Sequence, residues 1–209
     1  MPRTSKAALI LAIFLIFSPG CLSGIQTQDP PPIHYYTLEY DPPELNKIQL
    51  PSVLNIQEFS AGPNCNTDKL VYNPAERTRE NYHYHRWRSS PGDLVTYFLR
   101  RDLQQGRLFS AVSGPGFDSR CTHRLQGLVE EFYEMNKDNK SYAVAQMSIT
   151  LLQCNQKDIS QRVLTQETYR AREEMDRATP GQLAKAMSKV MQKLSKQISR
   201  DVYQELEGN

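Results

Sequence analysis

Apolar residues near the start of the chain form one unbroken block, whereas those further on alternate with polar residues. The block runs from Ala7 to Phe17 after a short basic opening, and it ends just before Cys21. It is too short for a helix that crosses a bilayer core, which takes about 20 residues. A basic start, a short apolar segment and a small residue before the cleavage point are typical of a secretory signal peptide. We therefore expect residues 1–20 to be a signal peptide that is removed on export.

A cysteine directly follows the predicted cleavage point. The segment Ser18-Pro19-Gly20-Cys21 resembles a bacterial lipobox, in which signal peptidase cuts before a cysteine that carries diacylglycerol. The resemblance implies lipidation of Cys21, and the alternative is a plain secretory signal cut nearby, which leaves a free thiol. Acyl chains bury methylenes at about 0.8 kcal/mol each, so several chains anchor firmly. Leu22 stands where an aspartate would retain a lipoprotein in the inner membrane, so we expect the outer membrane, on its periplasmic face.

A polar stretch without apolar periodicity separates Cys21 from the rest of the chain. It runs to Ile33 and contains Asp29 followed by three prolines. Proline runs favour an extended chain of about 3.1 Å per residue, so this stretch could hold a domain up to roughly 35 Å from the headgroups. We therefore expect residues 21–33 to be a lipidated, proline-rich tether and residues 34–209 to form one domain.

Alternating apolar positions and aromatic or β-branched residues predict strands through the middle of the chain. The first strand stops at Asp41-Pro42-Pro43 and is expected at a sheet edge. The three longest runs follow one another across short polar loops, which indicates an antiparallel meander. The predicted strands are His34–Tyr40, Ser52–Ser60, Lys69–Tyr72, Asn81–Arg88, Leu108–Val112, Cys121–Met135, Ser141–Cys154 and Arg162–Arg172.

Apolar residues at helical spacing predict two amphipathic helices. Ser90 suits the cap of the first helix, Pro91 its first position and Asp93 a capping box, and Gly106 ends it. Thr179 begins the second helix by the same logic. The apolar positions are Leu94, Val95, Phe98, Leu99 and Leu103 in the first helix, and Leu183, Met187, Val190, Met191, Leu194, Ile198, Val202 and Leu206 in the second. These elements predict an α+β two-layer domain, with a mostly antiparallel sheet and both helices on one face.

Charge narrows the classes of partner. Loss of residues 1–20 removes Arg3 and Lys6, so the mature chain carries 25 − 2 = 23 basic residues against 23 acidic ones. This balance argues against a nucleic-acid partner, because such proteins concentrate positive charge. The second helix does carry a basic stripe opposite its apolar face, which we interpret as a solvated face; contact with a partner or with headgroups is the alternative. The stripe is Lys185, Lys189, Lys193, Lys196 and Arg200.

Three cysteines remain besides Cys21, so at most one internal pair can form. If the first hairpin of the meander turns about Lys137-Asp138, opposed residues sum to 275, which is also the sum of 121 and 154. We therefore expect a disulfide between Cys121 and Cys154 facing each other on neighbouring strands. Cys65 is the competing partner.

The sequence offers no catalytic constellation. His83 and His85 would lie on one side of a strand, but two ligands do not make a metal site, and we interpret them as part of an aromatic packing face. The chain has no Gly-x-Ser-x-Gly nucleophile turn, no glycine loop for phosphate and no Cys-x-x-Cys pair. We expect no enzymatic activity, no cofactor and no metal.

Several short segments, taken in order, carry a resemblance to one protein family. They are Cys21, Tyr35-Tyr36-Thr37-Leu38, Val53-Leu54-Asn55-Ile56, Trp87-Arg88-Ser89-Ser90-Pro91, Leu94, Leu103, Phe109-Ser110-Ala111-Val112, Leu125-Gln126-Gly127 and the terminal helix. With these segments the mature chain resembles the ABC-type transport auxiliary lipoproteins, which are encoded with MCE-domain transport systems, including the paraquat-inducible system. The three extra cysteines and the basic Arg120-Cys121-Thr122-His123 depart from the family pattern.

The resemblance implies a non-enzymatic component of a lipid transporter that spans the envelope. Its partner would be an MCE-domain protein, which this chain would hold at the outer membrane through its own lipid anchor. Several copies of this chain could surround that partner. The alternative function is a lipoprotein that activates a cell-wall synthase. If docking is the function, exposed aromatics should form the contact, because tyrosine is enriched at interface cores. The candidates are Tyr35, Tyr36, Tyr82 and Tyr84.

Overall fold

The computed structural model describes residues 29–116, 120–158 and 161–208. The chain divides into two units, Met1–Pro31 and Pro32–Asn209, and the second contains every helix and strand described below. The predicted signal peptide, Cys21 and most of the tether lie outside the described residues. The described end of the tether, residues 29–33, is exposed and has no regular secondary structure. No helix within the described part of the chain is long and apolar enough to cross a membrane.

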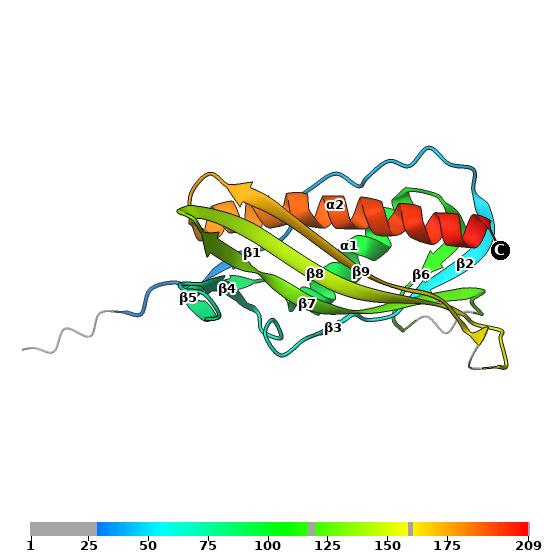
Figure 1. Ribbon diagram of the computed structural model, residues 1–209, viewed down its shortest axis with the longest axis horizontal. Coiled ribbons are helices and arrows are strands. Elements are labelled where there is room, and N and C mark those ends of the chain that lie inside the picture. The colour runs from blue at the N-terminus through cyan, green and yellow to red at the C-terminus, as the bar shows by residue number, and fades with distance from the viewer. Residues whose placement is uncertain (1–28, 117–119, 159–160, 209) are drawn as a thin grey trace, which may run out of the picture. The chain divides into compact units, whose positions relative to one another are not determined.

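The second unit contains nine strands and two helices among its described residues (Figure 1). In chain order they are β1 (His34–Tyr36), β2 (Leu50–Ile56), β3 (Ser60–Ala61), β4 (Lys69–Asn73), β5 (Glu80–Trp87), α1 (Pro91–Gln105), β6 (Phe109–Ser113), β7 (His123–Lys137), β8 (Lys140–Gln153), β9 (Val163–Met175) and α2 (Pro180–Glu207).

Strand β7 organises the sheet, because it is long enough to pair with several strands along each edge. On one edge it runs antiparallel to β8, which in turn runs antiparallel to β9, so the predicted meander is confirmed. On the other edge β2, β3 and β4 follow one another, each parallel to β7. Strand β6 extends the sheet beyond β2, while β5 and then β1 extend it beyond β4. The long strands are thus antiparallel, as predicted, whereas the short parallel strands were not anticipated.

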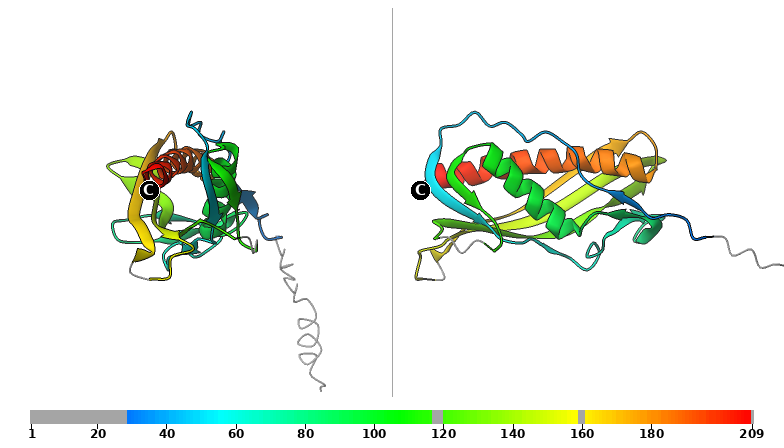
Figure 2. Two further views of the ribbon diagram at one scale, coloured as in Figure 1. Left: turned by 90° about the vertical axis from the view of Figure 1, so that its right-hand side faces the viewer. Right: turned by 180° about the vertical axis from the view of Figure 1, so that it is seen from behind.

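Both helices lie on the concave side of the curved sheet (Figure 2). Helix α2 packs on β8 and β9, and α1 packs on β3, β6 and β7. All the apolar positions predicted for the two helices are buried. The core also holds Trp87, whose ring meets Phe132 edge-on with centroids 5.3 Å apart. The predicted α+β class, with both helices on one face, is confirmed.

Local capping fixes where both helices begin. The Ser90 hydroxyl accepts a hydrogen bond from the Asp93 amide at 3.2 Å, and the Asp93 carboxylate accepts one from the Ser90 amide at 3.3 Å. This is the predicted capping box. In α2 the Thr179 hydroxyl accepts from the Gln182 amide at 3.4 Å. These bonds satisfy backbone amides of the first turn that have no partner within the helix, so each helix begins at a defined residue.

The first predicted strand, His34–Tyr40, is shorter than expected. Strand β1 ends at Tyr36 because the chain then leaves the sheet and runs beside the helices. The Glu39 amide donates to the Ser188 hydroxyl of α2 at 2.9 Å, and the Tyr40 hydroxyl donates to Asp102 of α1 at 2.8 Å. These side-chain bonds replace the ladder that an extended sheet strand would have made. The predicted strand Ser52–Ser60 is likewise divided, into β2 and the start of β3.

The disulfide between Cys121 and Cys154 is present in the structure, but the register used to predict it was wrong. The hairpin turns at Asp138 and Asn139, both with positive φ, so opposed residues sum to 277 near the turn, as in Lys137 and Lys140. A bulge reduces the sum to 276 further along, as in His123 and Gln153. The two cysteines therefore lie just beyond the strand ends and one position out of register, with Cα atoms 6.0 Å apart. Cys65 is free and buried.

Candidate docking surface

The four candidate tyrosines lie where β1 pairs with β5, but on two different faces. Strand β1 is parallel to β5 and pairs Tyr35 with Arg86 and Tyr36 with Trp87. Successive side chains on a strand point to opposite faces, so Tyr36 lies on the same face as the buried Trp87, while Tyr35 lies on the other. The structure therefore does not bring all four tyrosines into one patch.

Tyr36 and Tyr82 belong to a half-buried polar cluster on the inner face. The Tyr36 hydroxyl lies 2.9 Å from Nδ1 of His85, and the His85 ring stacks on His34 with centroids 5.3 Å apart. The Tyr82 hydroxyl donates to Glu134 at 3.0 Å, whose side chain is almost fully buried. Burial lowers the pKa of His85, and the neighbouring His34 lowers it further. The hydroxyls of this cluster are therefore occupied by internal partners.

Burial also raises the pKa of Tyr82, and the negative charge of Glu134 adds to the effect. Burial raises the pKa of Tyr36 as well. Both phenols therefore stay protonated at neutral pH and act as hydrogen-bond donors. The hydrogen bond from Tyr82 satisfies the buried Glu134 carboxylate, which would be costly to bury without a donor.

Tyr35 and Tyr84 form the exposed part of the candidate surface. Tyr35 is 54% exposed and Tyr84 is 43% exposed, and neither hydroxyl bonds to another described residue. The Arg88 guanidinium lies 5.8 Å from the Tyr35 ring centroid. Its neighbour Arg86 is held by Asp68, with Nη1 and Oδ2 2.9 Å apart. Exposed tyrosine beside arginine is the composition enriched at protein interfaces.

The two histidines of β5 do not converge on a metal site. Strand β5 bulges between Asn81 and Arg86, because Val71 pairs with Asn81 while Lys69 pairs with Arg86. The His85 ring is taken by His34 and Tyr36, whereas the exposed His83 lies against Tyr84. No group of three or more metal-binding side chains occurs within the described ranges.

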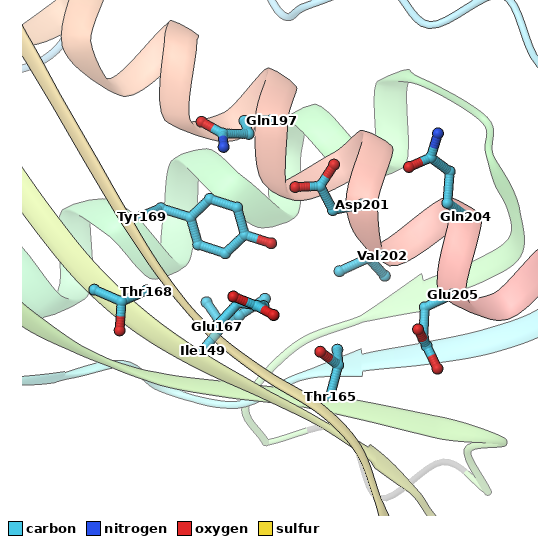
Figure 3. Close-up of a pocket in the computed structure, with 10 residues that line it drawn as sticks. All are labelled: Ile149, Thr165, Glu167, Thr168, Tyr169, Gln197, Asp201, Val202, Gln204 and Glu205. Carbon is cyan, nitrogen blue, oxygen red and sulfur yellow. The ribbon is translucent and has the colours of Figure 1, made fainter.

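A groove of about 390 Å³ lies between β9 and the C-terminal half of α2 (Figure 3). Tyr169 points its hydroxyl toward Asp201, and burial, followed by the charge of Asp201, raises the pKa of this phenol. Asp201 is in turn paired with Arg200 at 2.9 Å. The lining includes Thr165, Glu167, Gln197, Gln204 and Glu205. Its polar and acidic character does not suit an acyl chain.

A second groove, of about 330 Å³, lies beside β1 and had no counterpart in the sequence argument. The chain from Tyr35 to Glu39 forms one wall and the N-terminal half of α2 forms the other. The helix contributes Gly181, Ala184, Lys185 and Ser188. Small residues at this spacing on one helix face are a recognisable sequence signal, although nothing in the sequence shows what lies opposite them.

An apolar cluster lies on the face of the sheet opposite the main core. Val71, Tyr133 and Val144 are buried there, with Met135 and Tyr142 packed beside them. The Arg79 guanidinium covers the Tyr133 ring, 3.8 Å from its centroid, and Arg172 lies 5.3 Å from the centroid of Tyr142. Arginine stems and guanidinium groups thus shield this cluster where no helix covers the sheet.

The basic stripe of α2 is partly neutralised within the molecule. Lys189 and Lys193 both bind the Glu173 carboxylate of β9, at 2.9 and 2.6 Å. Their positive charge is therefore directed toward the sheet edge, which agrees with the interpretation of a solvated face.

The fold and its surfaces define an α+β domain with an exposed aromatic edge and two open grooves, of which the one between β9 and α2 is mainly polar. The chain belongs to the family described as the ABC-type transport auxiliary lipoprotein component, whose model matches residues 36–199. This is the family that the sequence resemblance indicated. No curated protein matches the sequence.

Solved structures share the fold at low sequence identity. A crystal structure from Xanthomonas campestris, assigned to the DUF330 family, superposes with a TM-score of 0.76 at 15% identity, covering 84% of this chain and 97% of the other. An uncharacterised protein gives a TM-score of 0.63 at 14% identity, covering 82% and 99%. A hypothetical protein from Chlamydia trachomatis gives 0.54 at 9% identity, covering 77% and 100%.

Proposed function

We propose that this lipoprotein is a non-catalytic component of an ABC-type lipid transport system, in which it docks the MCE-domain protein at the outer membrane. Membership of the auxiliary lipoprotein family supports a role in transport. The predicted anchor at Cys21 and the proline-rich tether support a position at the periplasmic face of that membrane.

The observation that carries the docking role is the exposed aromatic edge at β1 and β5. Tyr35 and Tyr84 expose about half of their surface while the neighbouring Tyr36 and Tyr82 are engaged internally. A rigid strand pair that presents two exposed tyrosine rings, that of Tyr35 beside Arg88, suits protein contact, because ordering these side chains costs little conformational entropy.

The polar groove between β9 and α2 and the filled core favour docking over carriage of a lipid inside this domain. The groove beside α2 in Figure 3 is lined by carboxylates, amides and hydroxyls. The main core is filled by large side chains such as Trp87, Tyr203 and Phe132, each almost fully buried. The cargo would therefore be handled by the partner, and this domain would position that partner.

Co-purification tests the proposal. The full-length lipoprotein, tagged at its C-terminus and extracted in mild detergent, should retain the MCE-domain protein of its own transport system. Membrane fractionation should place the complex with outer-membrane markers. Retention of a cell-wall synthase in place of the MCE protein would refute the transport role and favour the alternative function.

A further inference from the structure

We propose that the outer edge of β1 and the facing side of α2 form a site for an extended segment of a partner protein, which adds to the sheet as a further strand. The site is the 330 Å³ groove between the chain from Tyr35 to Glu39 and the start of α2. The inference deepens the docking function proposed above and rests on it for the identity of the partner.

The first argument is the unpaired edge of β1. Among the described strands it pairs only with β5, so it ends the sheet on that side. The Arg88 amide donates to the Tyr36 carbonyl at 2.8 Å, which shows that Tyr36 directs its backbone groups toward β5. In a parallel ladder alternate residues face opposite neighbours, so Tyr35 and Thr37 direct their amides and carbonyls outward. No other described residue bonds to these groups.

An open row of backbone donors and acceptors is a template for another extended chain. Edge strands are usually protected by charges, prolines or a covering segment. Residues 34–37 contain no proline, and His34 is the one side chain among them that can acquire a charge near neutral pH. Tyr35 and Thr37 are both exposed. The edge is therefore accessible to a partner strand.

The second argument is the shape of the facing wall. Helix α2 contributes Gly181, Ala184 and Ser188 at successive turns, so its backbone leaves room beside β1. The Ser188 hydroxyl, which accepts a hydrogen bond from the Glu39 amide, closes the far end of the groove. A β-carbon on Gly181 would meet no atom within 4 Å, which shows that the near end is open. The groove thus accepts side chains from one face of an added strand.

The third argument is charge, which selects the chemistry of the segment. The first turn of α2 contains no acidic residue, so the partial positive charge of the helix start is not compensated there. Lys185 adds a formal positive charge on the same wall and is exposed, whereas the exposed Glu39 adds a formal negative charge on the facing wall, at the Ser188 end. An acidic residue of the segment would therefore lie over the start of α2, away from Glu39. Small or apolar residues would face Ala184.

Two variants at one position separate occupation of the groove from changes in fold. Gly181→Phe places a ring in the open space and should block an added strand. Gly181→Ala adds only the β-carbon, which has room, and serves as the matched control. Thermal unfolding of both variants should remain close to that of the unchanged protein.

The first experiment does not depend on the MCE protein. A random-peptide phage library is selected on the tethered domain, residues 22–209, and the enriched peptides are bound to each variant. We expect peptides with an acidic residue and a β-prone sequence, with affinity unchanged by Gly181→Ala and reduced about tenfold or more by Gly181→Phe. If Gly181→Phe lowers the affinity of none of the enriched peptides, the site is overturned.

The second experiment identifies the partner. Binding of the purified MCE-domain protein is measured for the same variants, with hydrogen exchange of the Tyr35 and Thr37 amides as a second readout. Loss of binding in Gly181→Phe together with protection of these amides in the unchanged complex supports the proposal. Binding that survives Gly181→Phe leaves the docking function standing and overturns the site as its location. No binding by any variant overturns the docking function, and the peptide selection then decides the site alone.

A second copy of this chain is the competing occupant. Sedimentation of the domain alone would reveal an oligomer that Gly181→Phe dissociates and Gly181→Ala does not. Such a result would assign the groove to self-assembly and overturn the partner segment.

Discussion

The ring of Phe59 fills the space that a side chain on residue 127 would need. A β-carbon on Gly127 would overlap this ring and lie 2.5 Å from the Ser148 carbonyl oxygen. On its other side the Phe59 backbone approaches Gly92 at the start of α1 so closely that a β-carbon there would overlap the Phe59 carbonyl. Phe59, which is 2% exposed, is therefore held between the first helix and the central strand by two glycines.

Gly127→Ala should destabilise the domain by about 1–3 kcal/mol, because overpacking forces neighbouring side chains or backbone to shift. Urea unfolding should show a lower midpoint for this variant. Gly181→Ala is the control, since its added β-carbon meets nothing within 4 Å. Equal midpoints for Gly127→Ala and the unchanged protein would contradict the packing seen here. Addition of Phe59→Leu to Gly127→Ala should recover part of the loss.

Features that depend on neighbours in sequence were predictable. The capping box of Ser90 and Asp93 and the buried stripe of α2 follow from local hydrogen bonding and helical periodicity, and both are confirmed. The parallel pairing of β1 with β5 was not, because it joins residues about 50 positions apart through a register that no local pattern encodes. Bulges are equally hidden, since one extra residue on β7 shifts the register by one position and so brings the cysteines from two positions to one position away from direct opposition.

The candidate surface shows the same limit. Sequence composition singled out four tyrosines, but whether each ring faces solvent depends on the strand register and on the bulge in β5. The groove beside β1 was missed because its walls come from opposite ends of the chain. Small residues on α2 become informative only when the facing strand is known.

Removal of the disulfide should cost about 3–4 kcal/mol, because the bridge restricts a long loop of the unfolded chain. Its cysteines are 33 residues apart in the sequence. A Cys121→Ser and Cys154→Ser double variant should unfold at lower urea and lose any sensitivity to reductant. Cys65→Ala is the control and should keep that sensitivity. Peptide mapping without reduction that links Cys65 to either partner would contradict the pairing.

Glu173 should contribute to stability in a manner that depends on pH. Hydrogen bonds from Lys193 and then Lys189 lower its pKa below the ordinary value of 4.5. A lowered folded-state pKa means that the contribution is present above pH 4.5 and is lost as the pH falls through the lowered value. Because the pairs are largely exposed, we expect less than about 1 kcal/mol. Glu173→Gln should be less stable than the unchanged protein at pH 7 and equal to it at about pH 2. A difference that persists at low pH would point to packing instead of charge.

Lipidation of Cys21 is a separate prediction from the sequence. Cys21→Ala should abolish labelling by radioactive palmitate and release the protein from the membrane pellet, since acyl chains would be the anchor. Cys65→Ala should leave both properties unchanged, because Cys65 is buried within the domain. Palmitate labelling that survives Cys21→Ala would place the modification elsewhere.

The four tyrosines should separate into a pair that serves docking and a pair that serves stability. Tyr35→Ala and Tyr84→Ala should weaken binding of the MCE-domain protein about tenfold each with little change in the thermal transition, because these rings are exposed. Tyr82→Phe should instead lower stability by about 1–3 kcal/mol, because it leaves the buried Glu134 carboxylate without its donor.

Binding measured by calorimetry and unfolding measured in urea on the same preparations distinguish these effects. Lys189→Gln with Lys193→Gln is the control for the basic stripe, and it should leave binding nearly unchanged because both lysines already bind Glu173. If the lysine variant loses binding while Tyr35→Ala and Tyr84→Ala keep it, the docking surface would lie on the exposed side of α2 and not at the β1 edge. If none of these variants changes binding of the partner, the docking surface would instead be the face of the sheet covered by Arg79 and Arg172. The shielded aromatic cluster offers the remaining apolar contact there.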